Sequence, residues 1–470
     1  MRILFATSEA VPYWKTGGLA DVARSLPDAL VRRGHDVWLM LPLYADARRS
    51  IPLEEAGSAS IAWPGGPRTV RYFVHHPPSG APALFVDAPE AFDAPDPYAS
   101  DPASPLEAGL RFALFSRAVV ERARALGVDV VHANDWPTGL VPVYARIDGL
   151  EAPVVFAIHN LAYQGNFDPA ILAAAGISES FFTLDGLEFY GQASFLKAGL
   201  ALADRLVTVS PTYAREIQTE AFGAGLHGLL AHRADRLQGI LNGIDADHWN
   251  PTTDPAIPAR YDADSIERKE IDRDALLHEL KLDGRGPVFA IVSRLVHQKG
   301  IDLVLAALPG MVRAGARLAA LGTGDPALER ALRDAADRYP RRVAAVIGFD
   351  DALARRIYAG SDFFLMPSRY EPCGLGQMIA QRYGTVPVVR HTGGLVDTVV
   401  DAVTGFAFLS PTADALLDAV VRACAAWNGS GWRDLQKRCM ELDWSWTRSA
   451  AEYEALYESV ASRAGAPGRP

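Results

Sequence analysis

The chain has 470 residues, 49% of them hydrophobic, and a formal net charge of −10 from 46 basic and 56 acidic side chains. This length exceeds a single hydrophobic core and suits two α/β domains. The acidic balance disfavours a nucleic-acid scaffold, and no apolar run approaches the ~18 residues of a membrane-spanning helix. The three cysteines, Cys373, Cys424 and Cys439, lack metal-ligand spacing and favour a reducing, cytoplasmic compartment.

The first elements in chain order are a strand, a glycine loop and a helix. Ile3–Ala6 and Val37–Leu41 are apolar runs that predict buried strands, and Val22–Arg33 has the apolar spacing of a helix. Between them, Lys15–Asp21 reads K-T-G-G-L-A-D. This loop places bare backbone N–H groups and the Lys15 ammonium at a helix N-terminus, which favours an anionic ligand.

Strands and amphipathic helices alternate through most of the remaining chain, which predicts parallel sheets with right-handed crossovers. Residues 50–105 instead predict a hairpin-like excursion with a mobile loop near Phe92–Pro105. Asn242–Pro258, rich in Asn, Asp, Gly and Pro, is interpreted as a linker. Further strands are expected at Ala83–Val86, Val128–His132, Val154–Ile158, Arg205–Val209, Gly239–Leu241, Val288–Val292, Arg317–Leu321, Val343–Ile347, Asp362–Met366 and Val386–Val389. Further helices are expected at Asp302–Val312, Ala327–Arg338, Asp351–Ala359, Leu375–Tyr383 and Trp446–Arg463.

Two polar clusters follow consecutive predicted strands of the first half. One is H-A-N-D-W, from His132 to Trp136, and the other contains His159 and Asn160. A single histidine in such a position is more often structural than functional. Two of them, accompanied by Asp135 and Asn160, indicate a site for a polar substrate.

The strongest chemical signal of the second half is the segment Ser293–Gly300, S-R-L-V-H-Q-K-G. It follows a predicted strand and precedes a helix, where α/β sheets bind ligands. Arg294 offers a planar fork of donors and Lys299 a compact positive charge, so together they suit a diphosphate. The alternative is a solvated loop with two surface cations.

A second segment, Pro367–Gln377, reads P-S-R-Y-E-P-C-G-L-G-Q after another predicted strand. A carboxylate at Glu371 would repel phosphate, so we expect it to face sugar hydroxyls. Its simpler interpretation, compatible with the first, is a favourable charge near a helix N-terminus. Cys373 has no neighbouring base in the sequence and is interpreted as a packed residue lining the site, not a nucleophile.

The sequence T-G-G-L occurs in both halves, at residues 16–19 and 392–395, which suggests two similar domains facing a shared cleft.

The sequence disfavours several other kinds of active site. The chain lacks the phosphate-binding P-loop pattern and the nucleophile elbow of serine hydrolases, and Gly322–Asp325 has too few glycines for a dinucleotide fingerprint. The D-x-D pairs at Asp245 and Asp262 follow no strand directly and are interpreted as turns.

Taken together, these words resemble the bacterial glycogen synthases and their starch synthase relatives. K-T-G-G-L-A-D at 15–21, H-A-N-D-W at 132–136, N-G-I-D at 242–245, S-R-L-x-x-Q-K-G at 293–300, P-S-R-Y-E-P-C-G-L at 367–375 and T-G-G-L-x-D-T at 392–398 occur in the family's order. The resemblance implies a GT-B fold, an α/β architecture of two Rossmann-like domains at 1–241 and 242–445. A C-terminal helix at 446–470 would cross back to the first domain.

The resemblance also implies a retaining transfer of glucose from ADP-glucose to the non-reducing end of an α-1,4-glucan, with no metal or other cofactor. Its implied catalytic residues are Asp135, His159, Arg294, Lys299 and Glu371. Its implied substrate-binding residues are Lys15, Gly18, Asp21, Asn160, Asn242, Cys373, Gly374, Leu375, Thr392, Gly393, Gly394 and Leu395. Gly394 and Leu395 would offer backbone N–H groups to phosphate. Ile379 stands where related enzymes carry a second glutamate, and Phe349 is placed to flank the adenine.

Some alternatives stay open at this point. Only Asp135 and Glu371 are considered as nucleophiles of a covalent mechanism, and same-face attack assisted by the leaving phosphate is favoured. A related glycosyltransferase using UDP-glucose or a small acceptor is the nearest rival function. A non-catalytic protein that binds a sugar nucleotide or glucan is a more distant one. The sequence does not give the oligomeric state.

Overall fold

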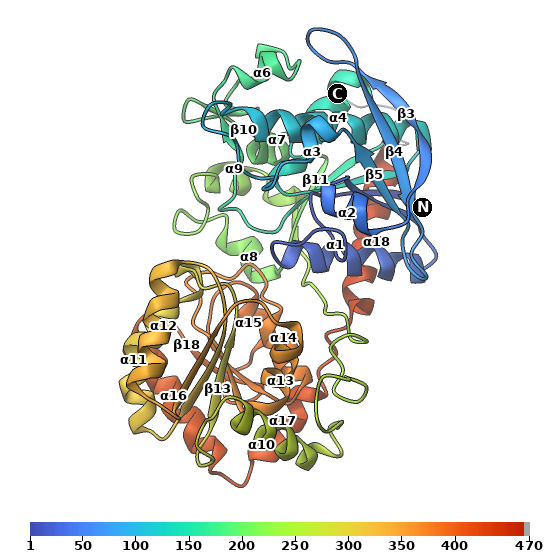
Figure 1. Cartoon of the computed structure of the whole chain (residues 1–470). Coiled ribbons are helices and arrows are strands. Elements are labelled where there is room, and N and C mark those ends of the chain that lie inside the picture. The colour runs from blue at the N-terminus through green and yellow to red at the C-terminus, as the bar shows by residue number, and fades with distance from the viewer. Residues whose placement is uncertain (465–470) are drawn as a thin grey trace. The chain divides into compact units, whose positions relative to one another are not determined.

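The computed structural model describes residues 1–464, which divide into two compact units (Figure 1). The first unit comprises Met1–Val209, Ala214–Asn242 and the C-terminal segment from Trp446. The second comprises Ser210–Tyr213 and Gly243–Ser445. Asn242 thus belongs to the first unit, whereas the sequence had placed it at the start of the second domain. Within residues 1–464, no helix combines the length and the apolarity needed to cross a lipid bilayer.

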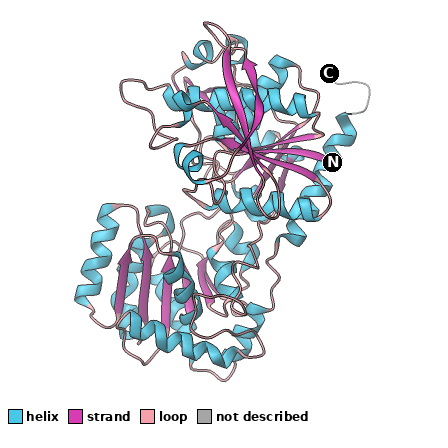
Figure 2. Ribbon diagram, turned by 45° about the vertical axis from the view of Figure 1, so that its right-hand side comes forward, coloured by secondary structure: helices cyan, strands magenta, loops and turns pink. Residues whose placement is uncertain are grey.

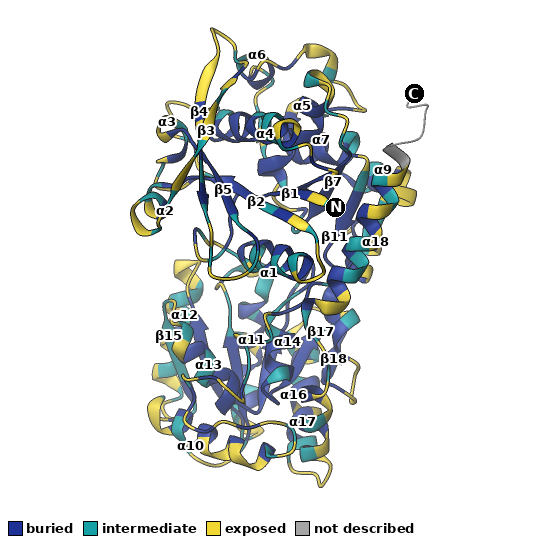
Figure 3. Cartoon of the chain, turned by 90° about the vertical axis from the view of Figure 1, so that its right-hand side faces the viewer, coloured by how far each residue is buried: buried dark blue, intermediate teal, exposed yellow. Residues whose placement is uncertain are grey.

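The first unit is built on a nine-stranded sheet in the order β12-β11-β7-β6-β1-β2-β5-β4-β3. Seven strands are parallel, and β3 and β4 add an antiparallel edge, which is the predicted excursion. Ile3, Leu4 and Phe5 of β1 are fully buried, as expected for a parallel strand covered on both faces. Figure 3 shows how buried and exposed residues are distributed over the chain. The strands are β1 (Arg2–Ala6), β2 (Asp36–Pro42), β3 (Glu54–Ile61), β4 (Arg68–His75), β5 (Ala83–Asp87), β6 (Val130–Asn134), β7 (Val154–Ile158), β11 (Arg205–Thr208) and β12 (Leu237–Gly239).

Helices cover this sheet, and a small antiparallel sheet lies beside it in the same unit. The helices are α1 (Gly18–Arg32), α2 (Ala45–Ser50), α3 (Pro89–Phe92), α4 (Glu107–Leu126), α5 (Val141–Asp148), α6 (Ile171–Ala174), α7 (Phe195–Leu202) and α9 (His227–His232). Helix α8 (Pro211–Glu216) begins in residues assigned to the second unit and ends in residues assigned to the first. The small sheet has the order β8 (Asn166–Phe167), β10 (Gln192–Ser194) and β9 (Glu188–Phe189).

The last helix, α18 (Trp446–Ala464), returns to the first unit and completes its core, which confirms the crossing-back helix. Tyr453, Leu456, Tyr457 and Val460 are all buried, and they pack in one cluster with residues of α1 and of the strands. These are the residues that the sequence placed on one face of this helix. The expected tail after it lies outside the described residues.

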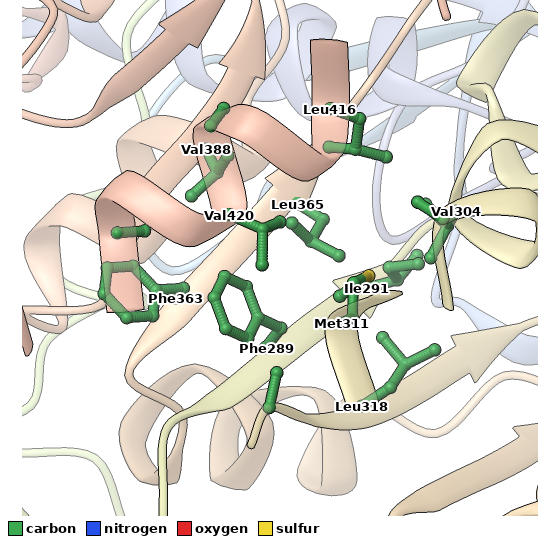
Figure 4. Packing of buried hydrophobic residues seen from close by; sticks show 14 of the residues in the cluster. Phe289, Ile291, Val304, Met311, Leu318, Phe363, Leu365, Val388, Leu416 and Val420 are labelled. Atoms are coloured by element: carbon green, nitrogen blue, oxygen red, sulfur yellow. The ribbon is translucent and has the colours of Figure 1, made fainter. Parts of the chain in front are cut away.

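The second unit contains a six-stranded parallel sheet in the order β15-β14-β13-β16-β17-β18, with helices on both faces (Figure 2). Its strands are β13 (Val288–Val292), β14 (Arg317–Gly322), β15 (Val343–Ile347), β16 (Phe363–Met366), β17 (Val386–Arg390) and β18 (Phe406–Phe408). Its helices are α10 (Lys269–Glu279), α11 (Ile301–Arg313), α12 (Pro326–Arg338), α13 (Asp351–Gly360), α14 (Gly376–Arg382), α15 (Gly394–Thr398), α16 (Ala413–Trp427) and α17 (Trp432–Met440). Its core includes the stacked rings of Phe289 and Phe363, 4.7 Å apart (Figure 4).

In each sheet the chain places its next strands first on one side of the first strand and later on the other side. In the first unit β2 lies on one side of β1 and β6 on the other; in the second, β14 and β16 flank β13 in the same way. Loops on the two sides of that first strand diverge and leave a crevice at the carboxyl ends of the strands, where α/β sheets bind ligands. The predicted motifs follow β1, β6 and β7 in one sheet and β13, β16 and β17 in the other, and each set consists of adjacent strands.

Two segments expected to be loose are held by side chains. The predicted linker, residues 242–258, is anchored within the second unit by Asp254. Its carboxylate accepts a hydrogen bond from the Tyr383 hydroxyl and forms an ion pair with Arg355 at 3.4 Å. The loop near Phe92–Pro105 is held by Arg111, which donates to the carbonyls of residues 91 and 97 at 2.5 Å each. The sequence missed both because the partners lie far away along the chain or on another element.

A buried lysine joins three elements of the second unit and gives a test of its stability. Lys269 Nζ donates to the carbonyls of Tyr358 (3.2 Å) and Ala359 (2.5 Å) and to Thr385 Oγ1 (2.8 Å). Replacing Lys269 by methionine keeps most of the side-chain volume but leaves these acceptors unpaired, at a cost of about 1–3 kcal/mol. We expect a lower midpoint in a denaturant melt of Lys269→Met and unaltered stability in Lys437→Met, on the partly exposed side of α17. An unchanged midpoint for Lys269→Met would contradict this role.

Candidate active site

In the first unit, the glycine loop after β1 is held by a carboxylate that the sequence analysis did not single out. Glu9 Oε2 accepts from the backbone N–H groups of Thr16 (2.6 Å) and Gly17 (3.2 Å), and Oε1 accepts from the Thr16 hydroxyl (2.9 Å) and the Tyr98 hydroxyl (2.9 Å). Glu9 is 5% exposed. Its carboxylate therefore fixes the loop and ties it to the segment that carries Tyr98.

This arrangement corrects the expectation of bare N–H groups in the loop. Two of them are already bound to Glu9, and Lys15 Nζ pairs with Asp21 Oδ1 at 2.8 Å, with both side chains more than one-third exposed. Helix α1 begins at Gly18, and Gly17 provides no side-chain cap. The exposed Lys15–Asp21 pair and the Gly18 helix start are the groups of this loop that remain accessible to a ligand.

Asp135 follows β6 in a strained backbone conformation. Its φ of +55° and ψ of −176° lie in a region that is essentially reserved for glycine, and such strain persists where the surroundings enforce it, commonly at functional sites. Oδ1 accepts from the backbone N–H groups of His159 (2.7 Å) and Asn160 (3.4 Å). Burial raises the pKa of the Asp135 carboxyl to about 7, although these two N–H donors oppose the rise.

The two histidines of the polar clusters have different positions. His132 is 1% exposed, stacks on Phe5 at 4.5 Å between ring centroids, and belongs to the core. His159 is only partly buried and lies at the end of β7, beside Asp135 and Asn160. The structure thus brings Asp135, His159 and Asn160 together, and it supports a structural role for His132.

In the second unit, the central contact joins the loop that follows β13 to the loop that follows β16. Lys299 Nζ lies 2.6 Å from Glu371 Oε2, and the Ser368 hydroxyl donates to the same oxygen at 2.9 Å. The Glu371 side chain is 6% exposed and that of Lys299 is 19% exposed. Two donors therefore fix one carboxylate oxygen of Glu371.

Further bonds connect the same two loops and make them one rigid platform. The Arg369 backbone N–H donates to the Gln298 carbonyl (2.8 Å), and Gln298 Nε2 donates to the Tyr370 carbonyl (3.2 Å). Arg369 also forms a bidentate pair with Asp302 at 2.8 and 2.7 Å. Because planar pairs of this kind fix geometry, Lys299 and Glu371 are held in position by their own loops.

The third loop, Thr392–Leu395, packs tightly against the second. A side chain on Gly393 would come within 1.8 Å of the Glu371 carbonyl oxygen, and one on Gly394 within 2.3 Å of the Cys373 carbonyl oxygen, so only glycine fits. Here the backbone N–H of Gly394 donates to the Glu371 carbonyl (3.1 Å) and that of Leu395 to the Thr392 carbonyl (3.1 Å). A phosphate bound at these N–H groups, as the resemblance implies, would have to replace these bonds.

The other residues predicted to bind the donor or the acceptor lie in loops or next to the first turn of a helix. Cys373 is 5% exposed, Gly374 has a φ of +76°, and Leu375 directly precedes α14. Arg294 lies exposed on the loop after β13, and Phe349, after β15, is 82% exposed. Asn242, in the first unit, is 5% exposed, and its Oδ1 has no hydrogen-bond partner within the described part of the chain.

No group of three or more His, Cys, Asp or Glu side chains within residues 1–464 is arranged to hold a metal ion. The two D-x-D pairs serve turns, since Asp245 Oδ1 accepts from the His248 N–H (3.0 Å) and Asp262 Oδ1 from the Ser265 N–H (2.9 Å). Both carboxylates are therefore engaged by their own backbone, as the sequence analysis interpreted them.

Sequence reasoning missed four side chains that organise these two sites, namely Glu9, Tyr98, Asn134 and Ser368. Asn134 and Ser368 lie inside quoted motifs, directly before Asp135 and three residues before Glu371, so their positions were an available signal. Tyr98 lies 89 residues from Glu9 in sequence, and no local pattern indicates that contact.

Comparisons with known proteins agree across the chain. Residues 2–232 match the starch synthase catalytic domain, and residues 272–430 match the glycosyl transferases of group 1. A glycogen synthase of Aromatoleum aromaticum is 46% identical, over 99% of this chain and 98% of that protein. A glycogen synthase of an Anaeromyxobacter species is also 46% identical, over 98% of this chain and all of that protein. The catalytic domain of starch synthase IV from Arabidopsis thaliana, solved with ADP and acarbose, superposes with a TM-score of 0.89 at 32% identity, covering 98% of this chain and 99% of that one.

Proposed function

This chain belongs to the glycogen and starch synthase family of GT-B glycosyltransferases, and from that membership we propose that it transfers glucose from ADP-glucose to the non-reducing end of an α-1,4-glucan, with retention of configuration. It is a glycosyltransferase that elongates a glucan. The observation that carries the finer proposal is the Lys299–Glu371 pair in the loops that follow β13 and β16 of the second sheet. The Arabidopsis relative, solved with ADP and acarbose, supports the identity of the donor and acceptor.

In this proposal the second unit binds the donor. Lys299 and the exposed Arg294 neutralise the diphosphate, and Glu371 accepts hydrogen bonds from hydroxyls of the transferred glucose. The exposed ring of Phe349 stacks on the adenine, a contact typically worth about 1–3 kcal/mol per base. Cys373, Gly374, Leu375 and the Thr392–Leu395 loop supply shape beside Glu371 rather than charge.

The first unit provides polar groups for glucose and the acceptor. Asp135, His159 and Asn160 form one connected cluster at the end of β6 and β7, and Lys15, Gly18 and Asp21 lie in the loop after β1. Asn242, with its unsatisfied Oδ1, is assigned to substrate binding on the same grounds. Carbonyl and carboxylate oxygens of this kind suit the hydroxyl groups of a neutral polymer.

The chemical step follows from the charges that develop. As the bond between glucose C1 and the β-phosphate oxygen breaks, negative charge grows on the departing ADP, and preorganised cations at Lys299 and Arg294 stabilise it. The acceptor 4-hydroxyl attacks C1 from the face that ADP leaves, and its proton passes to the departing phosphate oxygen. One oxygen of Glu371 is engaged by Lys299 and Ser368, and one oxygen of Asp135 by two N–H groups. The ion pair with Lys299 reduces the nucleophilicity of Glu371, which favours same-face attack over a covalent intermediate on Glu371.

The experiment that tests this proposal compares donors. Initial rates of glucose incorporation into glycogen are measured with ADP-glucose and with UDP-glucose at matched concentrations. We expect kcat/KM to be higher for ADP-glucose. A preference for UDP-glucose would favour the rival donor, and transfer from neither donor, with binding retained, would favour a non-catalytic binding protein.

We also propose that transfer needs no metal ion, because two cationic side chains already face the proposed diphosphate site. Activity with ADP-glucose is expected to be unchanged in excess EDTA, and added Mg²⁺ is expected to leave the rate within about twofold, since it would act only by screening. The rate is measured after dialysis against chelator. Complete loss of transfer, restored by Mg²⁺ or Mn²⁺, would defeat this proposal.

We further propose a cytoplasmic site of action. All three cysteines are buried and none forms a disulfide bond within residues 1–464, which suits a reducing compartment. Fractionation of cells that express the tagged full chain tests this location.

A further inference from the structure

A buried chain of hydrogen bonds runs through the first unit from helix α18 to His159. The Tyr457 hydroxyl lies 2.9 Å from His132 Nδ1, and His132 Nε2 lies 3.2 Å from Asn134 Oδ1. The same Oδ1 lies 2.8 Å from His159 Nε2. Tyr457, His132 and Asn134 are at most 1% exposed, so each polar atom among them needs a partner of the opposite kind.

The orientation of the Asn134 amide follows from a fourth contact. Asn134 Nδ2 donates to the Ala6 carbonyl oxygen at 2.8 Å. The reversed amide would place two oxygens against each other there and would turn an NH₂ group toward both histidines. Oδ1 is therefore the atom that faces the two rings, and a carbonyl oxygen can only accept hydrogen bonds.

The protonation of both rings is then determined. Burial lowers the pKa of His132 to about 3 and that of His159 to about 4, so each ring is neutral near pH 7 and carries one proton. Because Asn134 Oδ1 only accepts, that proton is on Nε2 in both rings. His132 Nδ1 is consequently an acceptor, and the Tyr457 hydroxyl donates to it. In His159, which is only partly buried, Nδ1 is likewise the acceptor of the ring.

We propose that Asn134 is a positioning residue that holds His159 as the neutral Nε2–H tautomer, so that its Nδ1 accepts a hydrogen bond from a sugar hydroxyl of the substrate. The inference rests on the proposed function, because it names how His159 meets the sugar. A charged imidazolium would present an N–H donor instead. It would also add positive charge near a glucose carbon that itself becomes positive in the transition state, and would thereby slow the reaction.

Helix α18 supports the same tautomer from the opposite end. Donation by the Tyr457 hydroxyl occupies His132 Nδ1 and keeps the His132 proton on Nε2, directed at Asn134. Asn134 thus accepts two hydrogen bonds through Oδ1 and donates one through Nδ2, so its amide cannot be turned over without losing them. Through Tyr457, the C-terminal helix therefore contributes to the chemistry of His159, which is distant in the sequence.

The direct test is the ¹⁵N spectrum of the histidine rings in the full-length wild-type protein, with His159 assigned by its disappearance in His159→Gln. We expect His159 to be protonated at Nε2 and unprotonated at Nδ1 from pH 6 to pH 8, and saturation with ADP-glucose and maltooligosaccharide to move the Nδ1 resonance. An Nδ1–H tautomer, or titration to the imidazolium within that range, would overturn the proposal.

A variant at Asn134 separates positioning from mere packing. In Asn134→Asp a carboxylate faces His159 and raises its pKa, so we expect a charged ring at pH 7 and kcat at least tenfold lower, with recovery as the pH rises. Because the pKa of the neighbouring Asp135 is raised to about 7, kcat is compared with that of the wild type at each pH. A purely structural loss would lower kcat by the same factor at every pH, and that result would overturn the proposal. Thr208→Val is the control, because Thr208 Oγ1 donates to the carbonyl of Ile158, the residue before His159, at 2.8 Å and not to an imidazole ring. It is expected to lower the melting temperature and to leave the His159 tautomer and the pH profile unchanged.

These measurements remain decisive in two difficult cases. If Asn134→Asp does not fold, the wild-type spectrum alone confirms or overturns the tautomer. If the spectrum shows the expected tautomer but no sugar nucleotide yields glucan elongation, the proposed function fails, while the control of His159 by Asn134 stands.

Discussion

Lys299→Ala is expected to lower kcat with ADP-glucose by about 10²–10³, the usual cost of removing one preorganised group that stabilises developing charge. The loss should appear in kcat more than in KM, because charge on the departing diphosphate is greater in the transition state than in the bound donor. The measurement is the rate of glucose transfer to glycogen at saturating donor, together with a thermal melt of each variant.

This substitution also carries a stability cost that the sequence alone does not reveal. From the sequence, Lys299 is a loop cation whose truncation should cost less than about 0.5 kcal/mol. The structure pairs it with the nearly buried Glu371. Its loss leaves Ser368 as the one remaining donor to Oε2 within residues 1–464, at a cost of about 1–3 kcal/mol. Assays are therefore run well below the melting temperature, with Lys437→Ala as a charge-matched control. Near wild-type kcat in folded Lys299→Ala would refute its assignment to the diphosphate.

Glu371→Gln is expected to lower kcat by about 10² or more, although glutamine has nearly the same shape and can still accept from Ser368. The amide loses the charge that fixes Lys299 and binds sugar hydroxyls less strongly than a carboxylate does. A matched control is Glu279→Gln, since Glu279 forms an ion pair with Arg356 at 2.8 Å on another face of the same unit.

The double variant Lys299→Ala with Glu371→Gln tests whether the two residues act as one unit. Because each holds the other in place, we expect the double variant to lose much less activity than the product of the two single losses. Strictly multiplicative losses would show that the pair at 2.6 Å has no functional coupling.

Much of the fold could be predicted from apolar segments and from the loop residues that separate them. Where the observed strands differ from the predicted ones, the cause can be identified. The strand expected at Val128–His132 is observed as β6, Val130–Asn134, because its ladder is set by pairing with β1 and β7 and continues into polar residues. The strand expected at Gly239–Leu241 is instead β12, Leu237–Gly239, in register with Leu206–Thr208. Apolarity thus locates a parallel strand, whereas its exact ends depend on neighbours that are distant in sequence.

Site residues could be predicted where polar side chains directly follow a predicted strand. They could not be predicted where the contacting residues are far apart in the sequence. Lys299 and Glu371 each follow a strand that the sequence identifies, but only the adjacency of β13 and β16 brings them together. The glycine loop after β1 was correctly located and its chemistry was misjudged, because the carboxylate of Glu9 binds two of its N–H groups. Glycines indicate an open backbone, but they do not indicate which group, from the protein or from a ligand, occupies it.

The most direct test of the central claim is the product of a single transfer. The enzyme is incubated with ADP-glucose and a maltooligosaccharide labelled at its reducing end, and the products are separated by length and examined by NMR. We expect labelled chains one glucose longer, with the new residue joined by an α-1,4 linkage at the unlabelled, non-reducing end. A β-linked product, addition at the labelled end, or no elongation with ADP-glucose would contradict a retaining synthase of α-1,4-glucan.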